Sequence, residues 1–186
     1  MATKVQIGLS PLIGVARAES ILARFKSRSP TTERVYCETG IDKLHSRLVR
    51  GLLDVIIVPS DSHTLAPADC VRLPLMSDQL MFVPRSSERA NWLGIEGVTV
   101  KDIANEKFIL IPDICGLTRA TLKLFQSIGA SLSRCSGQAS SYNSILEWSN
   151  VSLASGILPI SKVRNFQGLV IPILDGGHPV VIEYSI

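Results

Sequence analysis

The chain has 186 residues, a hydrophobic fraction of 46% and a formal net charge of +3. This length and composition allow a buried core in one domain or in two small lobes. Lys and Arg are spread along the chain, and no basic run is interleaved with aromatic residues. The sequence therefore does not indicate a nucleic-acid-binding surface.

The cysteines and the termini bear on the cellular compartment. Cys37, Cys70, Cys115 and Cys135 show no close pair and no metal-ligand spacing. No apolar run approaches the roughly 20 residues that a membrane-spanning helix needs, and the first residues show no secretory signal pattern. We therefore expect a reduced, cytoplasmic protein without a membrane partner.

The first third of the chain alternates between strand and helix patterns. We expect strands over residues 5–9, 32–38 and 55–58, with helices over residues 16–26 and 41–50 between them. In the second helix, Leu44, Leu48 and Leu52 sit at roughly helical spacing. The order β-α-β-α-β implies right-handed crossovers and a mainly parallel sheet.

Residues 49–59 carry the clearest local signal. Gly51 suits the position just past a helix end. Val55–Val58 is β-branched without polar alternation, which is typical of a strand covered on both faces. Pro59 ends this strand, and Ser60 follows at its carboxyl end, where ligands bind in open α/β sheets.

The rest of the chain continues the alternation after a polar loop over residues 60–68. We expect strands over 70–75, 79–84, 107–111, 132–139, 155–159, 169–174 and 180–184, and helices over 116–128 and 141–148 with a further helical turn over 151–154. Thr99 and Asp102 resemble a capping box and predict another helix start. Because residues 99–159 repeat the β-α-β order, the sequence indicates two α/β lobes, whose interface would favour a ligand pocket.

Several segments together carry a family resemblance. Ile7–Pro11, residues 44–58 with Gly51–Asp54, and Ala154–Pro159 resemble the effector-binding domain of LysR-type transcriptional regulators. Leu80–Pro84 falls in the expected order between them. The resemblance implies an α/β, type 2 periplasmic-binding-protein-like fold, in which two Rossmann-like lobes joined by two crossover strands hold an inducer cleft between them.

The resemblance also implies domain limits and partners. Lobe I would hold residues 1–84 and 164–186, and lobe II residues 85–163. We expect a homodimer or tetramer in which Val15–Ser27 and Arg34–Cys37 face the second lobe of a partner. The family's N-terminal winged helix-turn-helix and its final helix are absent from this sequence. Binding to DNA is therefore expected only through that missing domain.

The predicted effector-binding residues lie in four turns at strand ends. They are Ser10, Pro11, Leu12, Ile13, Pro59, Ser60, Ile114, Cys115, Gly116, Thr118, Gln138 and Ser140. In the first turn, the N–H groups that begin the following helix favour an anion. A simple helix cap at Ser10, an ordinary loop after Pro59 and an N-cap at Ser140 or Ser141 are the plainer explanations. Small, hydroxyl-bearing and apolar side chains suit a small organic anion or a modest aromatic acid.

Other functions find less support in the sequence. A redox role for Cys115 would need a lowered thiol pKa, exposure and a resolving partner, and Cys135, the nearest candidate partner, is expected in a core. The three histidines are scattered, and we find no catalytic triad order, paired carboxylates, metal cluster or phosphate-binding loop. We therefore expect neither an enzyme nor a cofactor. A solute-binding protein of a transport system, which shares the fold, is the alternative to a ligand-sensing regulatory domain.

Overall fold

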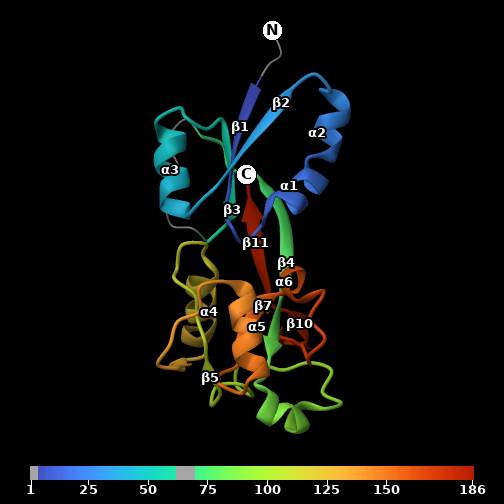
Figure 1. Cartoon of the computed structure of the whole chain (residues 1–186), viewed down its shortest axis with the longest axis vertical. Coiled ribbons are helices and arrows are strands. Elements are labelled where there is room, and N and C mark those ends of the chain that lie inside the picture. The colour runs from blue at the N-terminus through green and yellow to red at the C-terminus, as the bar shows by residue number, and fades with distance from the viewer. Residues whose placement is uncertain (1–3, 62–69) are drawn as a thin grey trace. The chain divides into compact units, whose positions relative to one another are not determined.

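The computed structural model describes residues 4–61 and 70–186, which form two compact units (Figure 1). Unit 1 holds Met1–Met76, Ile114–Gly116 and Glu183–Ile186. Unit 2 holds Ser77–Asp113 and Leu117–Ile182. Residues 164–182 thus fall in unit 2, which differs from the expected lobe limits. The expected loop over 60–68 lies, from residue 62 onward, outside the described residues.

Unit 1 is built on parallel strands, as the sequence predicts. Its elements in chain order are β1 (Lys4–Leu9), α1 (Val15–Ile21), α2 (Ala23–Arg28), β2 (Glu33–Glu38), α3 (Ile41–Val49) and β3 (Val55–Pro59). β1 lies between β2 and β3 and is parallel to both, with Ile7 opposite Tyr36 on one side and Val55 on the other. Figure 1 shows α3 on one side of these strands and α1 and α2 on the other.

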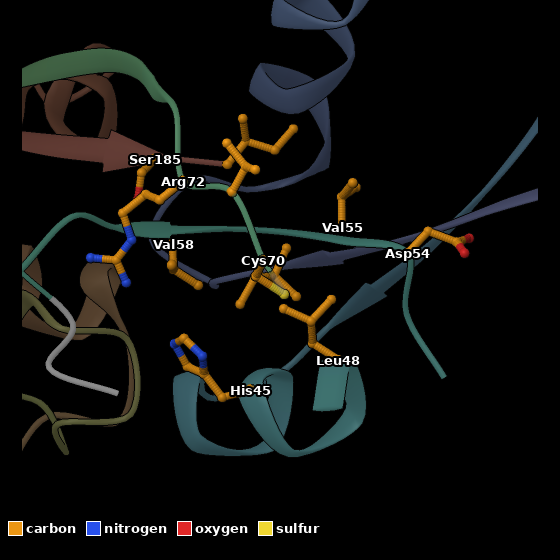
Figure 2. Close-up of a pocket in the computed structure, with 11 residues that line it drawn as sticks. His45, Leu48, Asp54, Val55, Val58, Cys70, Arg72 and Ser185 are labelled. Atoms are coloured by element: carbon orange, nitrogen blue, oxygen red, sulfur yellow. The ribbon is translucent and has the colours of Figure 1, made fainter. Parts of the chain in front are cut away.

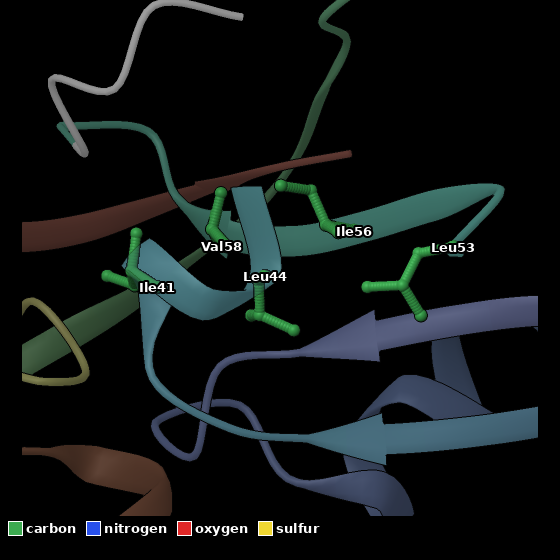
Figure 3. Packing of buried hydrophobic residues seen from close by; sticks show 5 residues of the cluster. All are labelled: Ile41, Leu44, Leu53, Ile56 and Val58. Atoms are coloured by element: carbon green, nitrogen blue, oxygen red, sulfur yellow. The ribbon is translucent and has the colours of Figure 1, made fainter. Parts of the chain in front are cut away.

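Helix α3 covers one face of this sheet. His45 and Leu48 of α3 line a cavity (Figure 2). The apolar cluster beneath the helix is drawn in Figure 3 and consists of Ile41, Leu44, Leu53, Ile56 and Val58. Burial of such aliphatic side chains stabilises a fold by about 1.5–3 kcal/mol each relative to exposure, so this cluster holds α3 on β3.

The end of α3 confirms one expectation and corrects another. Gly51 follows the helix with φ of 67°, the left-handed conformation that favours glycine at a helix end. Leu52, which the helical spacing placed on the buried face, is 47% exposed, whereas Leu53 is 3% exposed. The reason is that the helix ends at Val49, so the helical spacing no longer applies beyond it.

The expected single helix over 16–26 is two helices. α1 ends at Ile21 and α2 begins at Ala23, with Leu22 at φ −82° and ψ 5° between them. Arg34 on β2 donates from Nε to Glu19 of α1 at 3.0 Å, and the Tyr36 hydroxyl donates to the same carboxylate. These bonds lower the pKa of Glu19, the Tyr36 bond contributing most, and they tie α1 to the edge strand.

Unit 2 contains most of the second half of the chain. Its own elements are η1 (Ser86–Trp92), β5 (Lys107–Phe108), α4 (Leu117–Gln126), β6 (Ser133–Arg134), α5 (Tyr142–Asn150), β7 (Gly156–Pro159), α6 (Ile160–Val163), β8 (Ile171–Pro172), β9 (Leu174–Asp175) and β10 (His178–Pro179). The expected long strands over 107–111 and 132–139 are reduced to the short parallel pair β5 and β6. T-shaped aromatic contacts fill the core, since Phe108 lies 6.2 Å from Phe82 and 5.3 Å from Phe125 between ring centroids.

Two expected helical segments of unit 2 are turns. The Thr99 N–H and hydroxyl donate to the Asp102 carboxylate at 2.7 and 2.8 Å, which lowers the pKa of Asp102. The capping pattern therefore closes a turn without starting a helix. In the segment 151–154, Ser152 has φ of 62°, and a residue in the left-handed region cannot continue a right-handed helix.

Two strands contribute residues to both units. The two strands expected over 70–75 and 79–84 are one, β4 (Pro74–Val83), and the last strand is β11 (Val181–Ser185). Within unit 1, β11 pairs antiparallel with β3, with Tyr184 opposite Pro59. Within unit 2, β4 pairs antiparallel with β7 and β8, so the sheets are mixed rather than mainly parallel. Among the described residues, no helix combines the length and apolar character needed to cross a membrane.

Candidate effector site

The first predicted turn begins at Ser10, whose side chain is fully buried. Its hydroxyl donates to the Cys115 carbonyl at 3.2 Å and accepts from the Leu12 N–H at 3.3 Å. Its N–H donates to the Ile57 carbonyl at 3.0 Å, which continues the ladder beyond β1. Ser10 therefore joins the turn to a segment far away in the sequence, and its hydroxyl is already occupied by backbone partners.

The next residues of this turn face inward. Leu12 is 0% and Ile13 is 3% exposed, and the Ile13 N–H donates to the Ser10 carbonyl at 3.0 Å. Gly14 is the N-cap of α1 with φ of 73° and has no side chain to cap the helix. Leu12 and Ile13 thus serve the core, and their N–H groups are bonded to Ser10 within the turn.

Residues Ile114–Gly116 pack against this turn within unit 1. The Ile41 N–H donates to the Ile114 carbonyl at 2.9 Å, which anchors the tripeptide to the start of α3. Gly116 has φ of 89°, and a Cβ there would lie 3.1 Å from Pro59 Cγ and 3.2 Å from Ile41 Cδ1. Both its conformation and the close approach of Pro59 require glycine at this position.

Pro59 and Ser60 are the remaining predicted effector-binding residues in unit 1. Pro59 is the last residue of β3 and is buried. The Ser60 N–H donates to the Glu183 carbonyl at 2.8 Å, while the Ser60 carbonyl accepts from Arg72 Nη1 at 3.1 Å. The structure therefore brings Ser10, Pro59 and Ile114–Gly116 together within unit 1, although the expected lobe limits placed Ile114–Gly116 in lobe II.

In unit 2, Thr118 lies in the first turn of α4. Its side chain is 8% exposed in the folded chain and donates from Oγ1 to the Ile111 carbonyl at 2.7 Å. Asp113 caps the same helix, because its Oδ1 accepts from the Arg119 N–H and its Oδ2 from Arg119 Nε, both at 3.1 Å. The Thr118 hydroxyl thus holds α4 on the preceding strand segment.

The last predicted pair precedes α5. Gln138 and Ser140 are exposed and flank the buried Ala139, whose N–H donates to the Leu110 carbonyl at 3.0 Å. Ser141 is the N-cap of α5, since its hydroxyl accepts from the Ser144 N–H at 3.1 Å. Of the two N-cap positions left open by the sequence, the structure selects Ser141. Gln138 and Ser140 have their side chains in reach of solvent.

The cysteine arrangement bears on the redox alternative. None of the four cysteines forms a disulfide in the described part of the chain, and Cys115 is 1% exposed. Cys135 belongs to unit 2, and its thiol donates to the Gly137 carbonyl at 3.4 Å. A sensor thiol needs solvent access, and the Cys115 side chain does not have it. Nowhere in residues 4–61 and 70–186 do three His, Cys, Asp or Glu side chains gather as metal ligands.

A protein-family comparison decides the family. The model described as "LysR substrate binding domain" matches residues 1–185. The chain belongs to this family. Family membership identifies the chain as the effector-binding domain of a LysR-type regulator, as its sequence motifs indicated.

Solved structures agree with this assignment. The effector-binding domain of QuiR, in complex with shikimate, has a TM-score of 0.78 at 17% identity and covers 100% of this chain and 87% of that chain. The reduced form of OxyR from N. meningitidis has a TM-score of 0.78 at 18% identity, over 98% of this chain and 84% of that chain. These similarities confirm the type 2 periplasmic-binding-protein-like α/β fold.

The LysR substrate binding domain is one part of longer relatives. The chain covers 61% of full-length BenM, with a TM-score of 0.78 at 18% identity, and 63% of CbnR, a LysR family transcriptional regulator. No curated protein sequence matches the chain. The family and the fold are therefore established.

Proposed function

We propose that this domain senses a small-molecule effector for a LysR-type bacterial transcription factor in the cytoplasm. The observation that carries the proposal is the family match over residues 1–185. Binding would favour one arrangement of the two units and of neighbouring subunits, and so control the DNA-binding domains by population shift. The family points to binding rather than catalysis.

We further propose where the effector binds. In unit 1 it would meet the Ser10–Ile13 turn and Ser60, and in unit 2 the start of α4 and the exposed Gln138 and Ser140. Its placement between the units stays a prediction. Ser60, Gln138 and Ser140 carry uncharged polar side chains that are half-buried or exposed, which suits a small organic anion. QuiR, bound to shikimate, gives one hydroxylated carboxylic acid to test.

The hydrogen bonds of the candidate residues decide which substitutions test the proposed effector contacts best. Ser10→Ala and Thr118→Ala would remove bonds that hold the fold together, so lost binding would not distinguish contact from instability. Ser60→Ala and Ser140→Ala remove hydroxyls of a half-buried and an exposed side chain. Ser46→Ala on α3 and Ser133→Ala on β6 are matched controls at exposed positions.

The experiment is a calorimetric titration with a panel of small organic acids that includes shikimate. We expect at least one acid to bind with one-to-one stoichiometry, and Ser60→Ala or Ser140→Ala to weaken it by about tenfold, as for the loss of one hydrogen bond to a charged group. The control variants should bind as the wild type does. If the acid binds all four variants equally, the assigned turns do not contact it.

The transport alternative is not favoured by the comparisons. The structural relatives QuiR, OxyR, BenM and CbnR match over nearly the whole chain, and CbnR is a LysR family transcriptional regulator. We also propose a homodimer or tetramer in which the α1–α2 segment and β2 contact a second copy.

A further inference from the structure

The parallel strands of unit 2 bring three chain segments to one edge of their sheet. β5 is parallel to β6, with Phe108 opposite Arg134, and a parallel bridge joins Phe108 to Ser155, the residue before β7. The ladder continues past β6, because the Ala139 N–H donates to the Leu110 carbonyl at 3.0 Å. The segments that follow β5, β6 and β7 therefore all begin at the carboxyl-end edge of this sheet.

The direction of the chain connections reverses at β5. From β5 the chain passes through α4 to β6 on one side, and from β6 it returns through α5 to β7 on the other side. In open α/β sheets, ligands bind outside the carboxyl ends of the strands at such a reversal. Two of the three segments at this edge hold the proposed effector residues Thr118, Gln138 and Ser140. The third segment begins with α6, which was not among the residues predicted from the sequence.

Lys162 of α6 brings a positive charge to this edge of unit 2. Its Nζ lies 4.7 Å from the centroid of the Tyr142 ring, which is a cation–π contact. Both side chains are half-buried. Tyr142 is the first residue of α5 and follows shortly after Ser140 in the chain. The contact therefore holds the ammonium group beside the start of α5, next to the segment that carries Gln138 and Ser140.

Asp78 of β4 fixes the position of α6. Its carboxylate is buried and accepts from the Ser161 hydroxyl at 2.6 Å and from the Ser161 N–H at 3.4 Å. These bonds hold the residue that precedes Lys162. Neither α6 nor the first turn of α5 contains an acidic residue, and the positive end of the α5 dipole favours an anion at the same place. The local charges therefore favour a carboxylate beside Lys162.

We propose that Lys162 selects the charge of the effector, by pairing with one carboxylate group of a small organic acid at this edge of unit 2. The inference rests on the proposed function, because it adds the residue of that site that recognises the acid. A bond between an ammonium group and a carboxylate is stronger than a bond between neutral groups. The site therefore prefers an acid to its uncharged amide, while Gln138 and Ser140 supply uncharged polar contacts beside the carboxylate.

The first test compares shikimate and benzoate with their primary amides by calorimetric titration. We expect an acid to bind at least about tenfold more tightly than its amide. Lys162→Met should remove this preference by weakening the acid and leaving the amide unchanged. Lys162→Arg should restore it, because a guanidinium keeps the charge and also packs on an aromatic ring. Lys107→Met removes the same charge from the exposed amino end of β5, at the opposite edge of the sheet, and should bind as the wild type does.

The second test measures the reactivity of Lys162 itself. The acid should slow acetylation of Lys162 by acetic anhydride and leave the rate at Lys107 unchanged, as measured by mass spectrometry, and the amide should slow neither. Equal protection of both lysines, or a Lys162→Met variant that keeps the preference for the acid or loses acid and amide binding alike, would overturn this inference and leave the proposed function intact. Absence of binding by every acid tested would overturn both.

Discussion

His45 couples solution pH to the stability of the domain. Burial and the nearby positive charge of Arg72 lower its pKa from the ordinary 6.5. The unfolded chain therefore takes up the proton at higher pH than the folded chain does. Its contribution to stability is present above about pH 6.5 and is lost progressively as the pH falls below that value.

We predict that His45→Gln reduces this pH dependence. Between about pH 7.5 and about pH 5.5, the free energy of unfolding of the wild type should fall more than that of the variant. Urea denaturation at both pH values measures the difference. His178→Gln, at an exposed histidine of β10, is the control and should behave as the wild type. A variant with the same pH dependence as the wild type would show that His45 is not held neutral.

For single residues, the sequence predicted where the candidate residues lie along the chain better than it predicted which groups their side chains bond to. The turns at Ser10 and Ser60 were located correctly at the ends of β1 and β3, whereas those at residues 114–118 and 138–140 follow β5 and β6 only after several further residues. The patterns did not show that Ser10 bonds to Cys115 and Thr118 to Ile111. Such bonds depend on segments that only the folded chain brings together. His45 and Arg72 showed no motif at all, since helix α3 and the segment at Arg72 come together only in the folded chain.

Among the elements, the α3–β3 unit was the most predictable. Gly51 and the β-branched run after it are strong local signals, and both appear as expected. The expected helix over 16–26 breaks at Leu22, close to Glu19, which is bonded to Arg34 of β2. The helix expected from Thr99 is a turn that the local bonds from Thr99 to Asp102 close. Strand limits in unit 2 also differ, since pairing partners set them.

The packing of α3 on the sheet leaves no room at Gly8 of β1. A Cβ there would lie 2.7 Å from Leu44 Cδ2 and 2.7 Å from Leu53 Cδ1. Gly8→Ala should therefore lower the free energy of unfolding by about 1–3 kcal/mol through overpacking. Thermal or urea denaturation measures the loss.

A double-mutant cycle separates overpacking from other causes. Leu44→Ala removes the α3 side chain whose Cδ2 the new methyl group would strike, at a cost of its own. The double variant should lose less stability than the sum of the two single variants. Strict additivity, or a neutral Gly8→Ala, would show that α3 is not packed this closely on β1.

For the whole molecule, the proposed oligomer depends on the α1–α2 side of unit 1. Phe25 of α2 is 41% exposed, and β2 is the edge strand of its sheet. A charge placed in an apolar interface opposes association because it must be desolvated. Phe25→Glu should therefore shift the domain toward monomer in light scattering coupled to gel filtration. Val49→Glu, at a 65% exposed apolar residue of α3, is the control. Equal dissociation by both variants would place the interface elsewhere.

We propose that one effector engages turns of both units of this LysR-type sensing domain. Amide hydrogen exchange measures this directly, with and without the acid that binds tightest in the calorimetric panel. We predict that binding slows exchange in the Ser10–Ile13 turn of unit 1 and in the segments around Thr118 and Ala139 of unit 2. Protection confined to one unit, or protection that avoids these turns, would contradict the claim.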